Sequence, residues 1–174
     1  IDEHLPETLN GDETHITQVL NNILSNAVKY TPSGSITFTV KLLSLQKESS
    51  VCQIYFSVKD TGVGIKDEDK KRLFDKFERL DQDINYHVEG TGLGMSIVSQ
   101  LLLAMDSKIE LDSKYGVGSD FHFVLTQCVI DQTSLGDFNT RRQKFALEND
   151  PGIDFIAPNA QILIVDDVQI NLDA

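Results

Sequence analysis

Apolar residues recur at three- and four-residue steps along residues 16–27, and this spacing predicts an amphipathic helix. Asp12 can cap its first turn, and Pro32-Ser33-Gly34 ends it. The apolar stripe is Ile16, Val19, Leu20, Ile23, Leu24 and Ala27, and the opposite stripe is Gln18, Asn22, Asn26 and Lys29. The polar stripe is either a plain solvated face or a binding site. Because Asn lowers helix propensity relative to Glu or Lys, a binding site is a serious candidate.

Two alternating segments follow, 35–45 and 51–60, and they predict a β-hairpin joined by the polar loop 46–50. In the second segment the apolar residues share one face, and Asp60 continues that register. A carboxylate at the end of a buried face is costly unless it receives hydrogen bonds. The N–H groups of the following turn can supply them, or Asp60 can recognise a ligand.

The second half of the chain predicts a helix from Gly94 to Met105 and a pair of strands, 108–112 and 120–128. Periodicity fades from Asp131 to Asn159, so we expect a linker there. Residues 161–165 form a short, continuously apolar segment, which is typical of a buried parallel strand.

Composition excludes several classes of protein. The net charge is −12 and no basic cluster is present, so we expect no nucleic-acid binding. No apolar run approaches the roughly 18 residues of a membrane span, so we expect no membrane contact by this chain.

Cys52 and Cys128 stand in apolar runs, and we expect two buried free thiols. The chain opens with Ile1-Asp2-Glu3 without a signal peptide, so we expect a cytoplasmic piece of a longer protein that carries any membrane anchor elsewhere.

Two glycine-rich turns, 60–65 (Asp-Thr-Gly-Val-Gly-Ile) and 90–94 (Gly-Thr-Gly-Leu-Gly), bracket a polar segment around residues 73–79. Glycine lets backbone N–H groups approach phosphates closely. Gly92 and Gly94 also stand where a helix begins, and a helix N-terminus attracts anions. This arrangement predicts a nucleotide cradle with a lid.

The same residues suit ATP. Asp60 can accept a hydrogen bond from the adenine amino group, and Gly62 and Gly64 leave room for the base. Asn26 offers a neutral oxygen of the kind that magnesium accepts. Lys29, one turn further along, offers a positive charge for the phosphates.

Other nucleotide motifs do not fit, because residues 81–89 are polar rather than a strand and no G-K-[ST] sequence occurs. The order of motifs instead resembles that of sensor histidine kinases. The N box of that family is matched by Asn22–Thr31 and its G1 box by Asp60–Ile65. Its F box is matched by Phe74–Arg79 and its G2 box by Gly90–Gly94.

This resemblance covers residues 1–130 and implies the Bergerat ATP-binding fold. That fold is an α/β (α+β) two-layer sandwich, with a mixed, mostly antiparallel sheet and helices on one face. The resemblance implies that Asn22, Lys29 and Arg79 are catalytic and that Asn26 is the magnesium ligand. The implied ATP-binding residues are Asn22, Asn26, Lys29, Tyr30, Asp60, Gly62, Gly64, Ile65, Arg79, Gly90, Thr91, Gly92, Leu93, Gly94 and Ser119.

The tail, residues 160–174, resembles the start of a response-regulator receiver domain, whose acidic magnesium pair matches Asp166 and Asp167. We therefore expect a catalytic domain at 1–130, a linker at 131–159 and a truncated receiver domain at 160–174, as in a hybrid kinase. The dimerisation helices with the phosphoacceptor His are absent. The expected partners are that dimerisation domain and the receiver domain of the same parent protein.

Three functions compete. The first is transfer of the γ-phosphoryl group of ATP to a histidine on a partner domain. The second is hydrolysis as in gyrase, but the Glu that activates water there is Asn22 here, and an amide cannot act as a general base. The third is a non-catalytic binding module, for which we would expect a damaged motif, and none is lost. Phosphotransfer is favoured.

Overall fold

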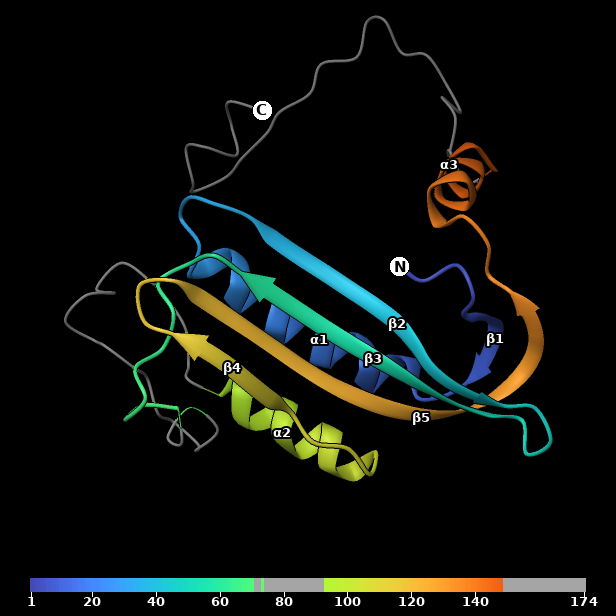
Figure 1. Cartoon of the computed structure of the whole chain (residues 1–174), viewed down its shortest axis with the longest axis horizontal. Coiled ribbons are helices and arrows are strands. Elements are labelled where there is room, and N and C mark those ends of the chain that lie inside the picture. Colours follow the sequence, from blue (N-terminus) through green and yellow to red (C-terminus); the bar gives the residue numbers. More distant parts are fainter. Residues whose placement is uncertain (71–72, 74–92, 149–174) are drawn as a thin grey trace, which may run out of the picture. The chain divides into compact units, whose positions relative to one another are not determined.

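A computed structural model describes residues 1–70, 73 and 93–148, and the chain divides into two compact units, Ile1–Phe138 and Asn139–Ala174. In the first unit, two helices pack on one face of a five-stranded sheet (Figure 1). The strands are β1 (Pro6–Asn10), β2 (Ile36–Gln46), β3 (Val51–Asp60), β4 (Glu110–Lys114) and β5 (Gly118–Ser134), and the helices are α1 (Glu13–Lys29) and α2 (Gly94–Ala104). The strand order is β1-β5-β3-β2, β4 also pairs with β5, and every pairing is antiparallel. The predicted two-layer sandwich is confirmed.

Helix α1 begins and ends as its sequence predicts. The side chain of Asp12 accepts a hydrogen bond from the backbone N–H of His15 at 3.0 Å, which satisfies one of the free donors of the first turn. Val19, Ile23 and Ala27 are buried, and the other members of the apolar stripe pack partly buried around them. The polar stripe is therefore held on the opposite side of the helix.

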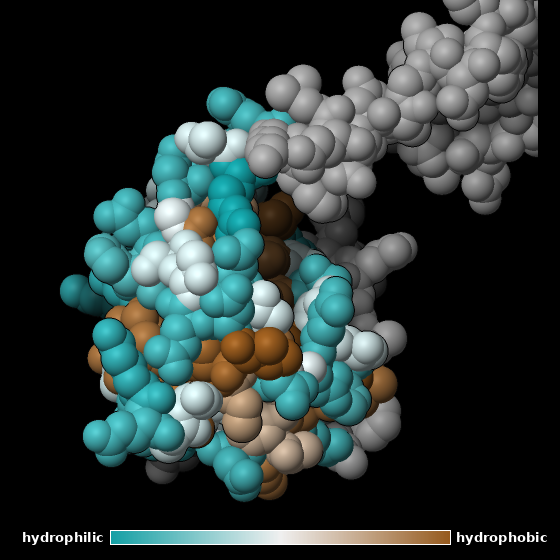
Figure 2. All heavy atoms as spheres, turned by 90° about the vertical axis from the view of Figure 1, so that its right-hand side faces the viewer, coloured by the Kyte–Doolittle hydropathy of each residue, from teal (hydrophilic) through white to brown (hydrophobic). Residues whose placement is uncertain are grey.

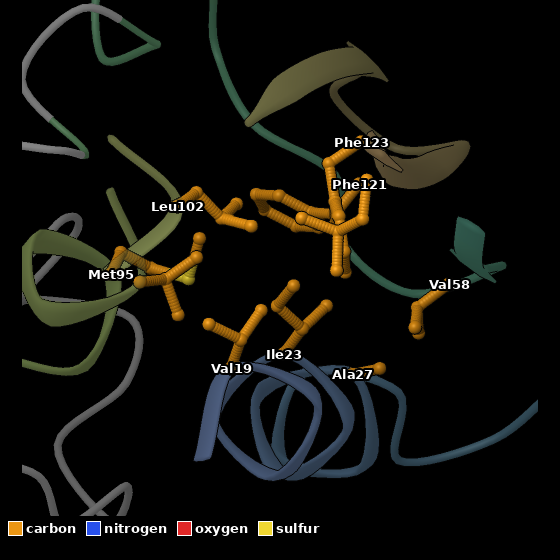
Figure 3. Packing of buried hydrophobic residues seen from close by; sticks show 10 residues of the cluster. Val19, Ile23, Ala27, Val58, Met95, Leu102, Phe121 and Phe123 are labelled. Carbon is orange, nitrogen blue, oxygen red and sulfur yellow. The ribbon is translucent and has the colours of Figure 1, made fainter. Parts of the chain in front are cut away.

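The main core lies between the helices and the sheet (Figure 3). Ile23 of α1 and Leu102 of α2 are fully buried and point towards Phe121 and Phe123 of β5. Burying a side chain of this size contributes about 1.5–3 kcal/mol. Since both helices contribute to one core, the ends of α1 and α2 are fixed relative to the sheet.

The hairpin of β2 and β3 places Asp60 at the edge of this core. The strands pair in register from Ile36 opposite Asp60 to Gln46 opposite Val51, with one irregularity near Ser44. Cys52, Ile54 and Val58 are buried on the predicted face. Asp60 shares that face and is only 6% exposed.

Strand β5 is longer than its sequence pattern predicts. It continues to Ser134, so the prediction that it ends at Cys128 is wrong. The extension pairs with β1, a strand that the sequence analysis does not identify. Val129 and Leu5 join a second buried cluster there, and this tertiary contact explains why local pattern alone did not predict either segment.

Cys128 is exposed, whereas Cys52 is buried, so the prediction of two buried thiols is wrong for Cys128. Cys128 opposes Val51, on the face of the sheet opposite to Cys52. Hydrophilic residues predominate on the side of the molecule seen in Figure 2, with a smaller hydrophobic area among them.

Helix α3 (Phe138–Glu148) lies in the stretch predicted to be a linker, and the sequence pattern does not predict this helix. Its sequence is mostly polar and charged, so it lacks the apolar stripe by which helices are identified. No helix among residues 1–70 and 93–148 is both long and apolar enough to cross a membrane.

Candidate functional site

The end of α1 is joined directly to the first glycine turn. The N–H of Val63 donates to the carbonyl oxygen of Tyr30 at 3.2 Å. A Cβ atom added to Gly62 would lie 2.1 Å from the same oxygen. Position 62 therefore requires glycine because α1 approaches it closely. The sequence analysis gives a different reason, that glycine leaves room for the base.

Backbone N–H groups of the described residues bond to only one of the two carboxylate oxygens of Asp60. Its Oδ1 accepts hydrogen bonds from the N–H of Gly62 at 2.8 Å and from the N–H of Ser119 at 3.3 Å. The following turn thus does cap the carboxylate, as the simpler interpretation expects. Within the described ranges no donor pairs with Oδ2, so this second oxygen stays available for a ligand.

A network of serines supports this carboxylate from the neighbouring strands. Ser119 lies opposite Asp60 on β3 and opposite Ser113 on β4. The Oγ of Ser113 lies 3.0 Å from the Oγ of Ser119 and accepts a hydrogen bond from the N–H of Ile65 at 2.8 Å. Ser113 thus contacts two predicted site residues, although the sequence analysis missed it. Its alternation with Leu111 on the inward face of β4 is the signal that could have identified it.

The second glycine of the first turn is fixed by the β4–β5 hairpin. Gly64 has a φ of +66°, and a Cβ there would lie 2.1 Å from the carbonyl oxygen of Lys114. The N–H of Gly116 also donates to the carbonyl oxygen of Val63 at 2.7 Å. The turn is thereby clamped between α1 on one side and the hairpin on the other.

The start of α2 lies against the polar stripe of α1. A Cβ on Gly94 would lie 3.1 Å from the Oδ1 of Asn22, whose Nδ2 donates to the carbonyl oxygen of Gln18 at 2.9 Å. Leu93 precedes the helix, and its carbonyl oxygen accepts a hydrogen bond from the buried hydroxyl of Ser96. The residues predicted from the second glycine turn that the structure describes thus lie beside the predicted N box.

Asn26, Lys29 and Tyr30 of the N box are half-buried. The Nζ of Lys29 lies 5.4 Å from the centre of the Tyr30 ring, close enough for a cation–π contact. The carboxamide of Asn26 makes no hydrogen bond to any residue that the structure describes. It is therefore available as a neutral oxygen ligand, and magnesium would take its other ligands from phosphate and water. No group of three His, Cys, Asp or Glu suited to a metal occurs in the described part of the chain.

Several predicted residues lie outside the described ones. These are Arg79, Gly90, Thr91 and Gly92 of the lid segment, and Asp166 and Asp167 of the tail. Their assignment remains a prediction.

Comparison with known proteins agrees with this geometry. Residues 11–128 match the model of the family described as histidine kinase-, DNA gyrase B-, and HSP90-like ATPase. Hybrid signal transduction histidine kinase B of Dictyostelium discoideum is 40% identical over 134 residues, 77% of this chain and 7% of its own length. Peroxide stress-activated histidine kinase mak2 of Schizosaccharomyces pombe is 34% identical over 165 residues, 93% of this chain and 7% of its own length.

The solved structures agree as well. The structure of full-length ShkA in complex with AMPPNP superimposes with a TM-score of 0.60 at 32% sequence identity, over 74% of this chain and 25% of ShkA. The chain thus spans only a small part of the length of these relatives. The family model nevertheless covers the whole candidate site from Asn22 to Ser119. The chain belongs to the family of histidine kinase-, DNA gyrase B- and HSP90-like ATPases.

Proposed function

We propose that this chain binds Mg-ATP and transfers the γ-phosphoryl group to a histidine on a separate dimerisation domain, as one step of a two-component phosphorelay. The observation that carries this proposal is that α1 contacts both glycine turns. Tyr30 bonds to the first turn at Val63, and Asn22 lies against Gly94 at the end of the second.

We assign one role to each group of the candidate site. The Oδ2 of Asp60 accepts a hydrogen bond from the adenine amino group. Asn26 holds magnesium, which supplies positive charge that neutralises the phosphates. Lys29 and Tyr30, at the C-terminal end of α1, contact the nucleotide near Asn26. Arg79, from the lid segment, is assigned to the terminal phosphate.

The transfer itself requires little chemistry from the protein. A neutral imidazole nitrogen of the partner's histidine attacks the γ-phosphorus with its lone pair, so no base is needed to activate it. The N–P bond forms, the bond from the γ-phosphorus to the bridging oxygen breaks, and ADP leaves with that electron pair. Catalysis then consists of orientation and charge neutralisation.

Rapid hydrolysis is disfavoured by Asn22. Its Nδ2 already donates to the carbonyl oxygen of Gln18 in the preceding helical turn. A carboxamide has no basic lone pair with which to take a proton from water. Asn22 is therefore proposed to orient groups at the phosphates, and ATP should be hydrolysed slowly without the partner domain.

The relatives support the wider assignment. Two of them are named histidine kinases, one of them a hybrid signal transduction kinase, and the named complex of ShkA contains an ATP analogue. The match to mak2 covers 93% of the chain, so it reaches beyond residue 148 into the tail. We infer a hybrid parent protein in which residues 160–174 begin a receiver domain, and a cytoplasmic site of reaction because ATP is the donor.

The test is incubation of this chain and the parent's dimerisation domain with γ-labelled ATP. Label on the dimerisation domain that is stable in alkali and labile in acid supports phosphotransfer, and a dimerisation domain with its histidine changed to Ala is the control. Release of labelled phosphate without labelled protein would indicate a hydrolase. Bound ATP with neither result would indicate a binding module.

A further inference from the structure

We propose that Ser113 is a positioning residue that fixes the direction of the Ser119 hydroxyl and thereby makes the site prefer a 6-amino purine over a 6-oxo purine. This inference rests on the proposed function, in which the base binds beside Asp60. It adds a residue and a mechanism of selectivity to that site.

The hydroxyl of Ser113 has three partners within hydrogen-bond distance. Its Oγ accepts a hydrogen bond from the N–H of Ile65 at 2.8 Å, donates to the carbonyl oxygen of Gly118 at 3.0 Å, and lies 3.0 Å from the Oγ of Ser119. A serine hydroxyl has one hydrogen and two lone pairs. These three contacts therefore use all of its hydrogen-bonding capacity.

The direction of the bond between the two serines follows from this count. The carbonyl oxygen of Gly118 can only accept, so the single hydrogen of Ser113 is committed to it. The N–H of Ile65 can only donate, so it occupies one lone pair of Ser113. The bond with Ser119 must then run from the Ser119 hydroxyl to the second lone pair of Ser113.

Ser119 is consequently left with acceptor capacity only. Its own N–H bonds to the Oδ1 of Asp60, so the two residues are direct neighbours on one face of the sheet. Asp60 Oδ2 and Ser119 Oγ are then two acceptors contributed by cross-strand neighbours. Both suit the amino group at C6 of adenine, and both repel the carbonyl oxygen at C6 of hypoxanthine or guanine. Burying such an unmatched pair of acceptors reduces affinity.

Removal of Ser113 should release this constraint. In Ser113→Ala the hydroxyl of Ser119 can rotate and donate to a 6-oxo group. We expect the preference for ATP over ITP, measured as the ratio of dissociation constants, to fall by about three- to tenfold, the scale of one hydrogen bond. Ser113→Thr keeps the hydroxyl and should retain most of the preference.

The experiment is calorimetric titration of the chain with Mg-ATP and Mg-ITP. Ser107→Ala is the matched control, because Ser107 also donates to a backbone oxygen, that of Val124 at 2.6 Å, outside the network of Asp60. Ser119→Ala should lower the preference as Ser113→Ala does. Because Ser113 acts through Ser119, the double variant should lose no more preference than Ser119→Ala alone.

Two results would overturn the inference. One is an unchanged ATP:ITP ratio in Ser113→Ala, whether or not both affinities fall equally. The other is an additional loss of preference in the double variant. If Ser113→Ala does not fold, an unchanged ratio in Ser119→Ala overturns it instead. Failure of the unmodified chain to bind ATP would refute the proposed function itself. Normal ATP binding with an unchanged ratio would refute only the role of Ser113.

Discussion

The N–H of Val63 and the carbonyl oxygen of Tyr30 form a hydrogen bond of 3.2 Å between the first glycine turn and the last turn of α1. This bond joins two motifs that lie more than thirty residues apart in sequence. It fixes the distance between the carboxylate of Asp60, held by the same turn, and the polar stripe of α1 that ends at Lys29. The predicted recognition of base and phosphates therefore depends on this connection.

Substitution of Asp60 tests the recognition of the base. In Asp60→Asn, the new NH₂ group must face either the adenine amino group or the N–H donors of Gly62 and Ser119, and neither contact can form a hydrogen bond. We expect ATP binding to weaken by about 1–3 kcal/mol in a calorimetric titration. Asp120→Asn is the control, because Asp120 lies on the other face of β5 and bonds to Ser57. Unchanged affinity in Asp60→Asn would refute the adenine role.

Substitutions of Asn26 and of Asn21, on the same helix, test the magnesium site. Asn26→Ala removes a carboxamide that bonds to no other described residue, so the dependence of ATP affinity on magnesium should disappear while the fold persists. Asn21→Ala removes an exposed carboxamide five residues earlier and should keep the dependence. ATP titrations with and without magnesium, together with circular dichroism, would measure this. A normal magnesium dependence in Asn26→Ala would count against Asn26 as the ligand.

Gly62 tests the connection between α1 and the glycine turn. In Gly62→Ala the new Cβ would overlap the carbonyl oxygen of Tyr30, so the turn or the helix end must shift. We expect a loss of about 1–3 kcal/mol in the free energy of unfolding, the scale of overpacking, together with weaker ATP binding.

Gly136→Ala separates these two effects. Gly136 has a φ of +71° but no atom within 4 Å of an added Cβ, so Ala there is strained without a clash. It should lower stability by roughly 1–2 kcal/mol and leave ATP affinity unchanged. Equal ATP affinities for both variants, measured by titration, would show that the contact with Tyr30 does not position the site.

Much of the fold could be predicted from the sequence, and so could the positions of the described candidate residues on their helix and strands, because the determining patterns are local. The apolar stripe of α1 and the alternation of β3 each identify one buried face, and the alternation carries Asp60 onto it. The glycines of the first turn mark places where backbones approach closely. Such signals need only neighbouring residues in the chain.

The errors concern features that depend on distant contacts. Strand β1 and the last residues of β5 have weak patterns of their own and are stabilised by pairing with each other and by the cluster around Leu5 and Val129. Ser113 was missed because its importance arises only when β4 pairs with β5 and brings it against Ser119. Cys128 was assigned to the wrong environment because an apolar run does not say which face is covered.

The N-terminal segment gives a pH-dependent prediction. Hydrogen bonds from the backbone N–H of His4 and that of Leu42 lower the pKa of Asp2 below its usual value. Because the folded-state pKa is depressed, the stabilisation is present above the unfolded pKa of about 3.9 and is lost as the pH falls through the lower, folded value. Asp2→Ala should therefore be less stable than the unmodified chain at pH 7, and the difference should shrink towards pH 3.

Urea unfolding at the two pH values measures this difference. Glu3→Ala is the control, because Glu3 is exposed and next in sequence. A difference for Asp2→Ala that does not change with pH would mean that the carboxylate charge contributes nothing there.

The most direct test of the central claim is the set of backbone amide NMR shifts that change when Mg-ATP is added to the chain. If one site is formed by α1, the first glycine turn and the start of α2, the largest changes should fall together at 22–31, 60–65, 94 and 119. Changes confined to one of these segments, or centred on the distant hairpin loop 47–50, would contradict the account.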